Sequence, residues 1–236
     1  MKYVTHVLVT AAFLGILSGC GRKVTVEARD HRPVRITRDG RLTFESEPMT
    51  EADLVALVAD RLERDRQSGV PSQYSLVLIQ PDGDTPYAKV RSVGDIIAEA
   101  GGCVGHPLSP RQQSSEVTPH VAIWNEYRQR EDRPIPSDSL FKELEQQRLR
   151  LKSSGALFLD GQEITEEQLI SLARKRVYLR MADGEPERHF DSTMFTMVVD
   201  ADTPYRHVER VEAVLSLNHC LVGVSVAKEE KGETRR

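Results

Sequence analysis

Two pairs of aspartates have the residue type and spacing closest to those of a chemical site. One residue separates Asp82 from Asp84, and one separates Asp200 from Asp202. Paired carboxylates can hold a divalent cation or act as general acid and base. They equally suit a structural role, in which they end a strand and favour the N-terminus of the next helix. No other acidic cluster lies at ligand spacing, so we predict the structural role and no metal.

The remaining residue types that catalyse reactions show no such pattern. The histidines are scattered without the spacing of a zinc site. The sequence contains no nucleophile elbow, phosphate-binding loop or dinucleotide-binding glycine motif. The formal net charge is −4, and basic residues are interspersed with acidic ones, which gives no case for nucleic acid. We therefore predict a protein that is not an enzyme and needs no cofactor.

The aspartate pairs belong to a repeated hexapeptide. Residues 82–87 read D-G-D-T-P-Y, and residues 200–205, which are 118 positions further on (200 minus 82), read D-A-D-T-P-Y. Apolar positions match at the same offset after each copy, which indicates one domain written twice. A length of 236 residues suits two domains of roughly 100 residues each. The matching apolar positions are Val90, Val93, Ile96 and Ile97, and Val208, Val211, Val214 and Leu215.

Two cysteines occupy nearly equivalent places in the two copies. Cys103 and Cys220 are 117 residues apart (220 minus 103), almost the repeat distance. A disulfide between them would join the two domains. Two unpaired, half-buried thiols are the other interpretation, because the sequence does not supply the Cα separation that a disulfide requires.

The N-terminus has the pattern of an export signal. The apolar run from Val7 to Leu17 has 11 residues, too few to cross a bilayer core of about 30 Å as a helix. It ends in Leu-Ser-Gly-Cys, which resembles the bacterial lipobox, in which the cysteine is lipidated. We predict a signal peptide at 1–19, lipidation of Cys20 and a tether at 20–33. A plain secretory signal is the alternative.

Each copy begins with a predicted β-hairpin and helix. Alternating apolar and polar residues flank the Asp-Gly pairs at 39–40 and 160–161. Thr50 and Thr165 then precede helical patterns as predicted N-caps, each with a residue three positions on that completes a capping box. An apolar stripe follows each cap, so one face of each helix must be covered.

A strand, a second helix and a last strand complete each copy. Thr85 and Thr203 of the repeated turn are predicted N-caps, with Pro86 and Pro204 at the first helical position. The order β-β-α-β-α-β predicts an α+β fold with two tandem domains, each with two helices packed on one face of a small mixed sheet. The strands predicted here are 74–79, 120–124, 193–199 and 221–226.

Composition sets the predicted boundaries. Gly, Pro, Ser and Gln dominate 101–117, which is predicted to be a surface loop, and charge and proline mark the segment between the copies. A helix is predicted at 137–151 within that segment. The predicted divisions are a first domain at 34–126, a linker with a helix at 127–154, a second domain at 155–227 and a charged tail at 228–236.

This ordered set of motifs resembles the periplasmic domain of the ExbD/TolR biopolymer-transport family over 34–126 and 155–227. Members of that family are inner-membrane proteins whose transmembrane helix holds an aspartate. The run from Val7 to Leu17 contains no acidic residue, so the resemblance does not imply proton conduction here. The residues that carry the resemblance are Asp39-Gly40, Thr50, Leu54, Asp82, Pro86 and Tyr87, and Asp160-Gly161, Thr165, Leu169, Asp200, Pro204 and Tyr205.

The resemblance implies a periplasmic part that dimerises and binds envelope partners. The expected function is that of a lipid-anchored, non-catalytic binding component of an ExbD/TolR-like transport system. A stand-alone envelope lipoprotein that binds protein or peptidoglycan is the alternative. Expected partners are the membrane, ExbB/ExbD- or TolQ/TolR-like proteins or peptidoglycan, and an internal pseudo-dimer of the two copies is a further expectation. The expected location is the periplasmic face of a bacterial membrane, with the outer membrane favoured by analogy. Expected partner-binding residues are Asp82, Pro86, Tyr87, Asp200, Pro204 and Tyr205.

Overall fold

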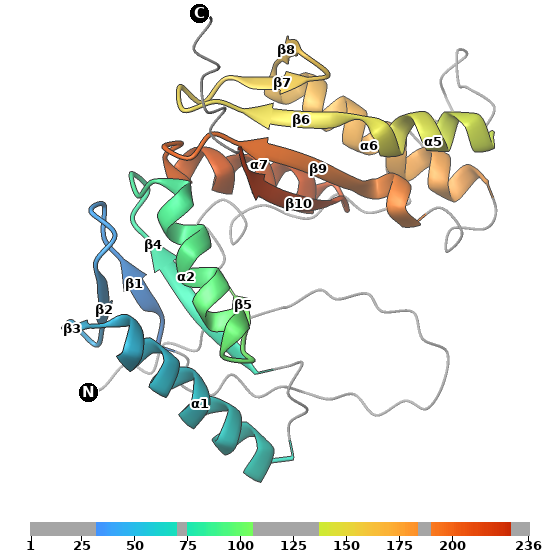
Figure 1. Cartoon of the computed structure of the whole chain (residues 1–236). Helices are drawn as coiled ribbons and strands as arrows, with labels where there is room; N and C mark the ends of the chain where they lie inside the picture. The colour runs from blue at the N-terminus through green and yellow to red at the C-terminus, as the bar shows by residue number, and fades with distance from the viewer. Residues whose placement is uncertain (1–31, 70–74, 106–136, 184–189, 228–236) are drawn as a thin grey trace, which may run out of the picture. The chain divides into compact units, whose positions relative to one another are not determined.

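The computed structural model describes residues 32–69, 75–105, 137–183 and 190–227. By its internal contacts the chain divides into two compact units. Among the described residues, the second unit contains 37–40 and 81–94 together with everything from 137 onward, and the first unit contains the others. The fold itself occurs twice in tandem, as a first copy at 34–105 and a second copy at 138–226 (Figure 1).

The first copy contains a five-stranded sheet and two helices. The sheet order is β3-β2-β1-β4-β5, in which β1, β2 and β3 are antiparallel neighbours and β4 and β5 are parallel. The elements are β1 (Val34–Ile36), β2 (Leu42–Phe44), β3 (Glu47–Met49), α1 (Glu51–Gln67), β4 (Leu76–Pro81), α2 (Tyr87–Glu99) and β5 (Cys103–Gly105).

The second copy repeats this arrangement after one extra helix. Its sheet order is β10-β9-β6-β7-β8, with β6, β9 and β10 parallel and β6, β7 and β8 antiparallel neighbours. The predicted α+β class, with tandem mixed sheets and helices, is therefore confirmed. The elements are α5 (Asp138–Gln146), β6 (Arg148–Leu151), β7 (Leu157–Leu159), β8 (Gln162–Ile164), α6 (Glu166–Ala182), the 3₁₀ helix η2 (Phe190–Thr193), β9 (Met194–Val199), α7 (Tyr205–Leu217) and β10 (Leu221–Val226).

Each sheet has one more strand than predicted, because the two Asp-Gly pairs mark different turns. The pair at 39–40 joins β1 to β2, whereas the pair at 160–161 joins β7 to β8. The counterpart of Gly40 is Gly155, 115 residues further on (155 minus 40), and both have φ near +84° (+83° and +85°). Glycine adopts this left-handed region without a steric penalty. The first hairpin of each copy therefore turns at a glycine, and a second turn leads to the extra strand.

The segment 137–151, predicted as one helix, is a helix followed by a strand. Helix α5 ends at Gln146, and the alternating sequence Arg-Leu-Arg-Leu at 148–151 forms β6 near the centre of its sheet. The period of two places Leu149 and Leu151 on the buried face. The helix also buries Phe141, so α5 and β6 belong to the second copy although the sequence placed them in a linker.

The last strand of the first copy also differs from the prediction. Residues 120–124, predicted as that strand, lie outside the described residues. The strand that follows α2 is β5 at Cys103–Gly105, at the start of the segment predicted to be a loop. It pairs in parallel with β4 at the edge of the sheet, where β10 pairs with β9 in the second copy.

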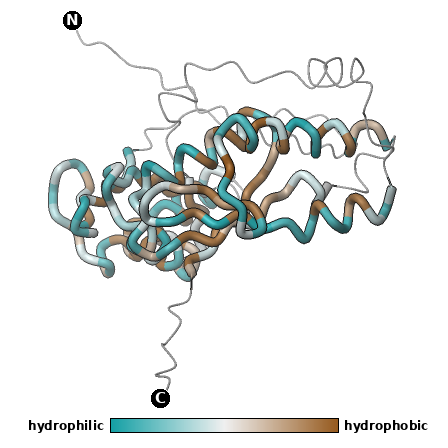
Figure 2. Tube along the Cα trace, turned by 90° about the horizontal axis from the view of Figure 1, so that it is seen from above, coloured by the Kyte–Doolittle hydropathy of each residue, from teal (hydrophilic) through white to brown (hydrophobic). Residues whose placement is uncertain are grey.

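The predicted starts of α1 and α6 are confirmed. The side chains of Thr50 and Thr165 each accept a hydrogen bond from the N–H three residues on, and both capping boxes are complete, with Asp53 and Gln168. These caps satisfy N–H groups that have no partner within the helix. Figure 2 shows hydrophobic and hydrophilic residues alternating along the helices, as amphipathic helices require.

The core of the second copy lies between α6, α7 and one face of the sheet. Strand β9 alternates, with Phe195, Met197 and Val199 fully buried. Helix α7 contributes its predicted apolar stripe, and α6 packs against α7.

In the first copy Gly102 marks a close approach, because a Cβ there would lie 2.9 Å from Val58 and 3.1 Å from Ile97.

An arginine is the largest fully buried side chain of the described residues. Arg176 of α6 lies over the ring of Phe195, 3.8 Å from its centroid, and donates to several backbone carbonyls. Burial lowers its pKa to about 10, so it keeps its charge at neutral pH. Arg61 of α1, at the equivalent place, is also buried and donates to the carbonyl of Leu76.

No helix within the described ranges is long and apolar enough to cross a membrane. The run from Val7 to Leu17 and the predicted lipidation site at Cys20 lie outside those ranges.

Candidate functional site

The residues of the repeated turn all lie in the second compact unit. Thr85 and Thr203 are fully buried, and the side chains of Tyr87 and Tyr205 are only 7% and 5% exposed. Burial raises the pKa of Tyr205, and the charges of Glu212 and Glu209 add to the shift. The burial favours packing of the tyrosines over the turn, and their predicted contact with a partner stays a prediction.

The turns at 83–88 and 201–206 bond to each other through the main chain, and we call them the paired turns. The N–H of Tyr87 donates to Thr203 O at 2.8 Å, and the N–H of Tyr205 donates to Thr85 O at 2.9 Å. Pro86 and Pro204 form an isolated antiparallel bridge between these bonds. The outer bonds run from Ala88 N to Ala201 O at 3.1 Å and from Arg206 N to Gly83 O at 2.9 Å.

The predicted threonine N-caps are wrong, because main-chain carbonyls take that role. Helix α7 has Pro204 as its N-cap, and no side chain caps it. The hydroxyl of Thr85 instead donates to Thr37 O at 3.1 Å. The N–H groups that begin α2 and α7 donate to carbonyl oxygens of the facing turn. Each helix start therefore has its free donors satisfied by the other turn.

The aspartates of the two turns hold neighbouring groups rather than one another. Asp82 accepts a hydrogen bond from the N–H of Arg38 at 3.2 Å, and Asp200 accepts one from the guanidinium of Arg150 at 3.2 Å. Asp84 forms an ion pair with Arg206. Within the described ranges, no group of three or more histidine, cysteine, aspartate or glutamate side chains is placed to hold a metal ion.

The two cysteines singled out by the sequence differ in burial. Cys103 is half-buried and Cys220 is buried. The thiol of Cys220 donates to the carbonyl of Ala173 at 3.6 Å, and burial raises its pKa to about 12. Cys103 and Cys220 belong to different compact units, and the disulfide between them stays a prediction.

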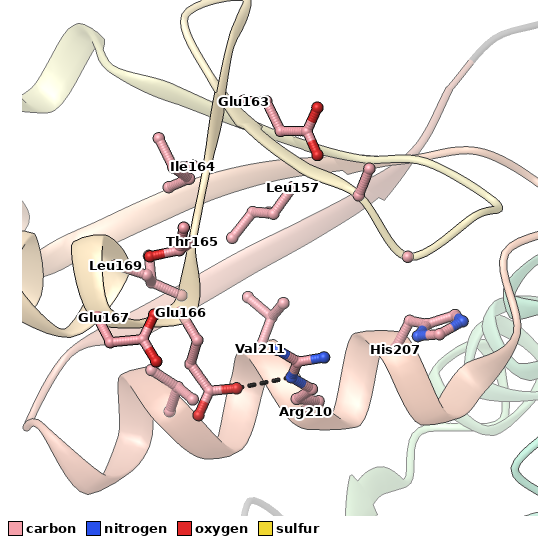
Figure 3. Close-up of a pocket in the computed structure, with 13 residues that line it drawn as sticks. Leu157, Glu163, Ile164, Thr165, Glu166, Glu167, Leu169, His207, Arg210 and Val211 are labelled. Carbon is pink, nitrogen blue, oxygen red and sulfur yellow. Dashed lines mark hydrogen bonds and ion pairs between the residues drawn. The ribbon is translucent and has the colours of Figure 1, made fainter.

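The sequence did not reveal a groove in the second copy, which we call the α6–α7 groove (Figure 3). Its volume is about 400 Å³. Apolar side chains from β7, α6 and α7 form its inner wall, and charged side chains stand at its rim. The lining residues are Gly155, Ala156, Leu157, Glu163, Ile164, Thr165, Glu166, Glu167, Leu169, His207, Arg210, Val211 and Val214.

An ion pair crosses the rim of this groove. Arg210 Nε lies 2.6 Å from Glu166 Oε2, joining α7 to the first turn of α6 (Figure 3). Glu167 beside it has a lowered pKa, because of hydrogen bonds at the helix start and, more weakly, the charge of Arg210. Burial and the charges of Arg206 and Arg210 lower the pKa of His207, which favours the neutral imidazole. The groove thus combines an apolar wall with a mixed-charge rim.

Glycine shapes one end of the groove. The ring of His207 lies against Gly155, where a Cβ would come within 2.7 Å of ring atoms. The sequence signals for this site were partial: the capping motif at Thr165 marked the start of α6, and the apolar stripe marked the inner face of α7. Nothing in the spacing indicated that Glu166 and Arg210, 44 residues apart, would meet.

No family model matches this sequence, and comparison with curated proteins and with solved structures finds no similar one.

Proposed function

We propose that this protein is a non-catalytic binding component of an ExbD/TolR-like biopolymer-transport system, anchored to a membrane by lipid on Cys20. The observation that carries the proposal is that the whole fold occurs twice, each time with a capped first helix and a strand that ends in the D-x-D-T-P-Y turn. These are the features on which the resemblance to that family rests.

We infer that the α6–α7 groove is the surface that contacts the partner. Its chemistry is that of a binding surface, with an apolar wall for burial and a charged rim for orientation. The Glu166–Arg210 pair leaves each charge partly neutralised by the other. A partner segment with apolar side chains and its own charges would fit both parts of the groove.

Affinity capture and crosslinking from native membranes test this proposal, with the full-length lipidated chain as bait. We expect inner-membrane motor-type proteins to be captured by the wild type. The variant Arg210→Ala should lose most of this capture, because it removes the cation from the rim. Arg64→Ala is the matched control, since Arg64 is equally exposed and also forms a 2.6 Å ion pair, with Asp60 of the same helix.

Two results would overturn the proposal. Capture of peptidoglycan with no motor-type protein would favour the stand-alone envelope lipoprotein. Equal capture by Arg210→Ala and Arg64→Ala would show that the groove is not part of the surface that contacts the partner. The predicted anchor has its own test, because Cys20→Ala should release the protein from the membrane fraction without changing its fold.

A further inference from the structure

We propose that the D-x-D-T-P-Y turn is a self-complementary recognition element whose partner in this chain is the other copy of the same turn. The inference goes beyond the proposed function, because it concerns what the turn binds and not which system the protein serves. All residues involved belong to the second compact unit.

The hydrogen bonds of the paired turns are reciprocal. Exchanging the two copies of the motif converts the bond from Tyr87 N to Thr203 O into the bond from Tyr205 N to Thr85 O. The same exchange converts the outer bond of Ala88 into the outer bond of Arg206. Two copies of one surface that bind each other in this way make an isologous contact, as in a two-fold symmetric dimer.

The prolines explain why this sequence suits such a contact. In an antiparallel pair, the residues of a non-hydrogen-bonded position face each other without using their own N–H groups. Pro86 and Pro204 occupy that position, flanked on both sides by the bonds of the neighbouring residues. Proline lacks an N–H, so it is tolerated here without loss of a bond and it holds the backbone extended.

The next residues supply the donors. Tyr87 and Tyr205 begin their helices, where N–H groups have no partner within the helix. Carbonyl oxygens of the facing turn accept hydrogen bonds from the N–H groups of these tyrosines and of the residues that directly follow them. Separating the turns would remove these carbonyl acceptors from the N–H groups that begin the two helices. Each turn is therefore stabilised by binding the other.

The two ends of the contact differ in their side chains. At one end Gly83 lies beside Arg206, and a Cβ on the glycine would make ordinary van der Waals contact with the Cβ of the arginine, at 3.4 Å. The same arginine forms an ion pair with Asp84. At the other end the equivalent residues are Ala201 and Ala88, so no ion pair forms there. The main chain carries the recognition, and this one ion pair makes the two ends different.

A disulfide across the bridge tests the pairing in the full chain. Facing residues at such a position have Cα atoms about 4.5 Å apart, within the range of about 4.4–6.8 Å that a disulfide spans. The double variant Pro86→Cys/Pro204→Cys, with the three native cysteines replaced by alanine, should form one internal disulfide under mild oxidation. The protein should stay monomeric and lose two hydrogen atoms in mass.

The matched controls are the two single variants in the same background. Each should retain a free thiol, because its bridge partner remains a proline. Free thiols in the oxidised double variant would overturn the proposal. Covalent dimers as the main product would overturn it too, because the partner would then be a turn of another chain.

A second variant keeps the proposal testable if the cysteine variants do not fold. Ala88→Pro removes the outer donor of one turn at the second residue of α2, where a helix tolerates proline. Amide exchange of Tyr205 and Arg206, on the facing turn, should accelerate by roughly tenfold or more. Ala52→Pro, at the second residue of α1, is the matched control and should leave both amides unchanged.

Equal exchange in the two proline variants would contradict the proposal, because the effect would then be general loss of stability. Neither measurement requires a partner protein. Failure of the membrane capture would therefore overturn the proposed function while leaving the self-pairing of the turns to be decided by the disulfide and by amide exchange.

Discussion

The two copies of the fold build different surfaces on the same backbone. In the first copy the cleft beside α1 and α2 is lined by apolar side chains and two glutamates, with Val55 44% exposed and about 330 Å³ of space. In the second copy the groove beside α6 and α7 has an ion pair at its rim and a histidine at one end. The residues that line the first cleft are Glu51, Ala52, Val55, Ile96, Glu99 and Ala100.

A second difference lies over the hairpin glycines, which the two copies share. The hairpin glycine of each copy is covered by the third residue of the second helix, Lys89 over Gly40 and His207 over Gly155. The geometry is the same, but the first copy presents a cation and the second an imidazole whose pKa is lowered. Shared positions set the fold, and the exposed positions give each copy a different surface chemistry.

The largest expected effect is the difference in stability between variants of the two buried arginines. Arg176 donates to Leu144 O at 2.6 Å and to Ser192 O and Met194 O at 3.2 Å each, whereas within the described residues Arg61 donates to one carbonyl, Leu76 O, at 3.0 Å. We expect Arg176→Ala to lower the free energy of unfolding by about 3–4 kcal/mol, because it leaves several carbonyls unsatisfied and opens a cavity. Arg61→Ala should cost about 1–2 kcal/mol.

Urea unfolding of the two variants measures this difference. Arg176→Lys is the informative companion, since it keeps the charge and loses the planar group that stacks on Phe195. Equal losses for Arg176→Ala and Arg61→Ala would show that the denser set of bonds around Arg176 adds no stability.

The next effect is a pH dependence that only the second copy should show. Burial, with Glu209 nearby, raises the pKa of Glu212 from 4.5 to about 7, and its counterpart in the first copy is Gly94. The folded protein therefore favours the protonated carboxyl. The stability that this proton contributes is complete below pH 4.5 and is lost as the pH rises through 7.

Glu212→Gln should remove this loss. We expect the variant to be more stable than the wild type by about 2 kcal/mol at about pH 8, and equally stable near about pH 4. Glu63→Gln is the opposite control: hydrogen bonds from Arg66 and Gln67 lower the pKa of Glu63 to about 2, so its loss should destabilise the protein at the higher pH. A wild-type stability that stays constant over this range would contradict the raised pKa.

Much of each copy could be predicted from local chemistry. The capping boxes at Thr50 and Thr165, the apolar stripes of four helices and β10 at 221–226 are where the sequence placed them. These features depend on neighbours within one turn or strand, so a short window contains the needed information.

The misplaced features depend on contacts distant in sequence. Arg176 interrupts the apolar face of α6, and its burial is made favourable by carbonyls from α5, η2 and β9, by the Gln147 side chain and by the ring of Phe195. The caps of α2 and α7 come from a turn 118 residues away (205 minus 87). The groove at Glu166 and Arg210 likewise requires two helices to meet. No local pattern encodes such partners.

The two capping boxes give a smaller and nearly equal effect. Thr50 and Thr165 accept from the third helical N–H at 3.2 and 3.3 Å, respectively. Thr50→Ala and Thr165→Ala should each lower the free energy of unfolding by about 1 kcal/mol. Thr→Ser at either position should restore most of it, which separates the hydroxyl from the methyl group. A loss confined to one copy would show that only that helix start limits stability.

The smallest expected effect is the one that matters most for the proposed binding surface. Arg210 is exposed and its pair with Glu166 joins two helices at the surface, so Arg210→Ala should change the free energy of unfolding by at most about 0.5 kcal/mol. Arg64→Ala should change it equally little, and both effects should shrink at high salt. If chemical unfolding shows the two variants to be equally stable, a loss of capture by Arg210→Ala alone reports on the groove surface. A markedly larger loss of stability in Arg210→Ala would mean that the ion pair holds α6 and α7 together. The charged rim of the groove would then have a structural role and not a binding role.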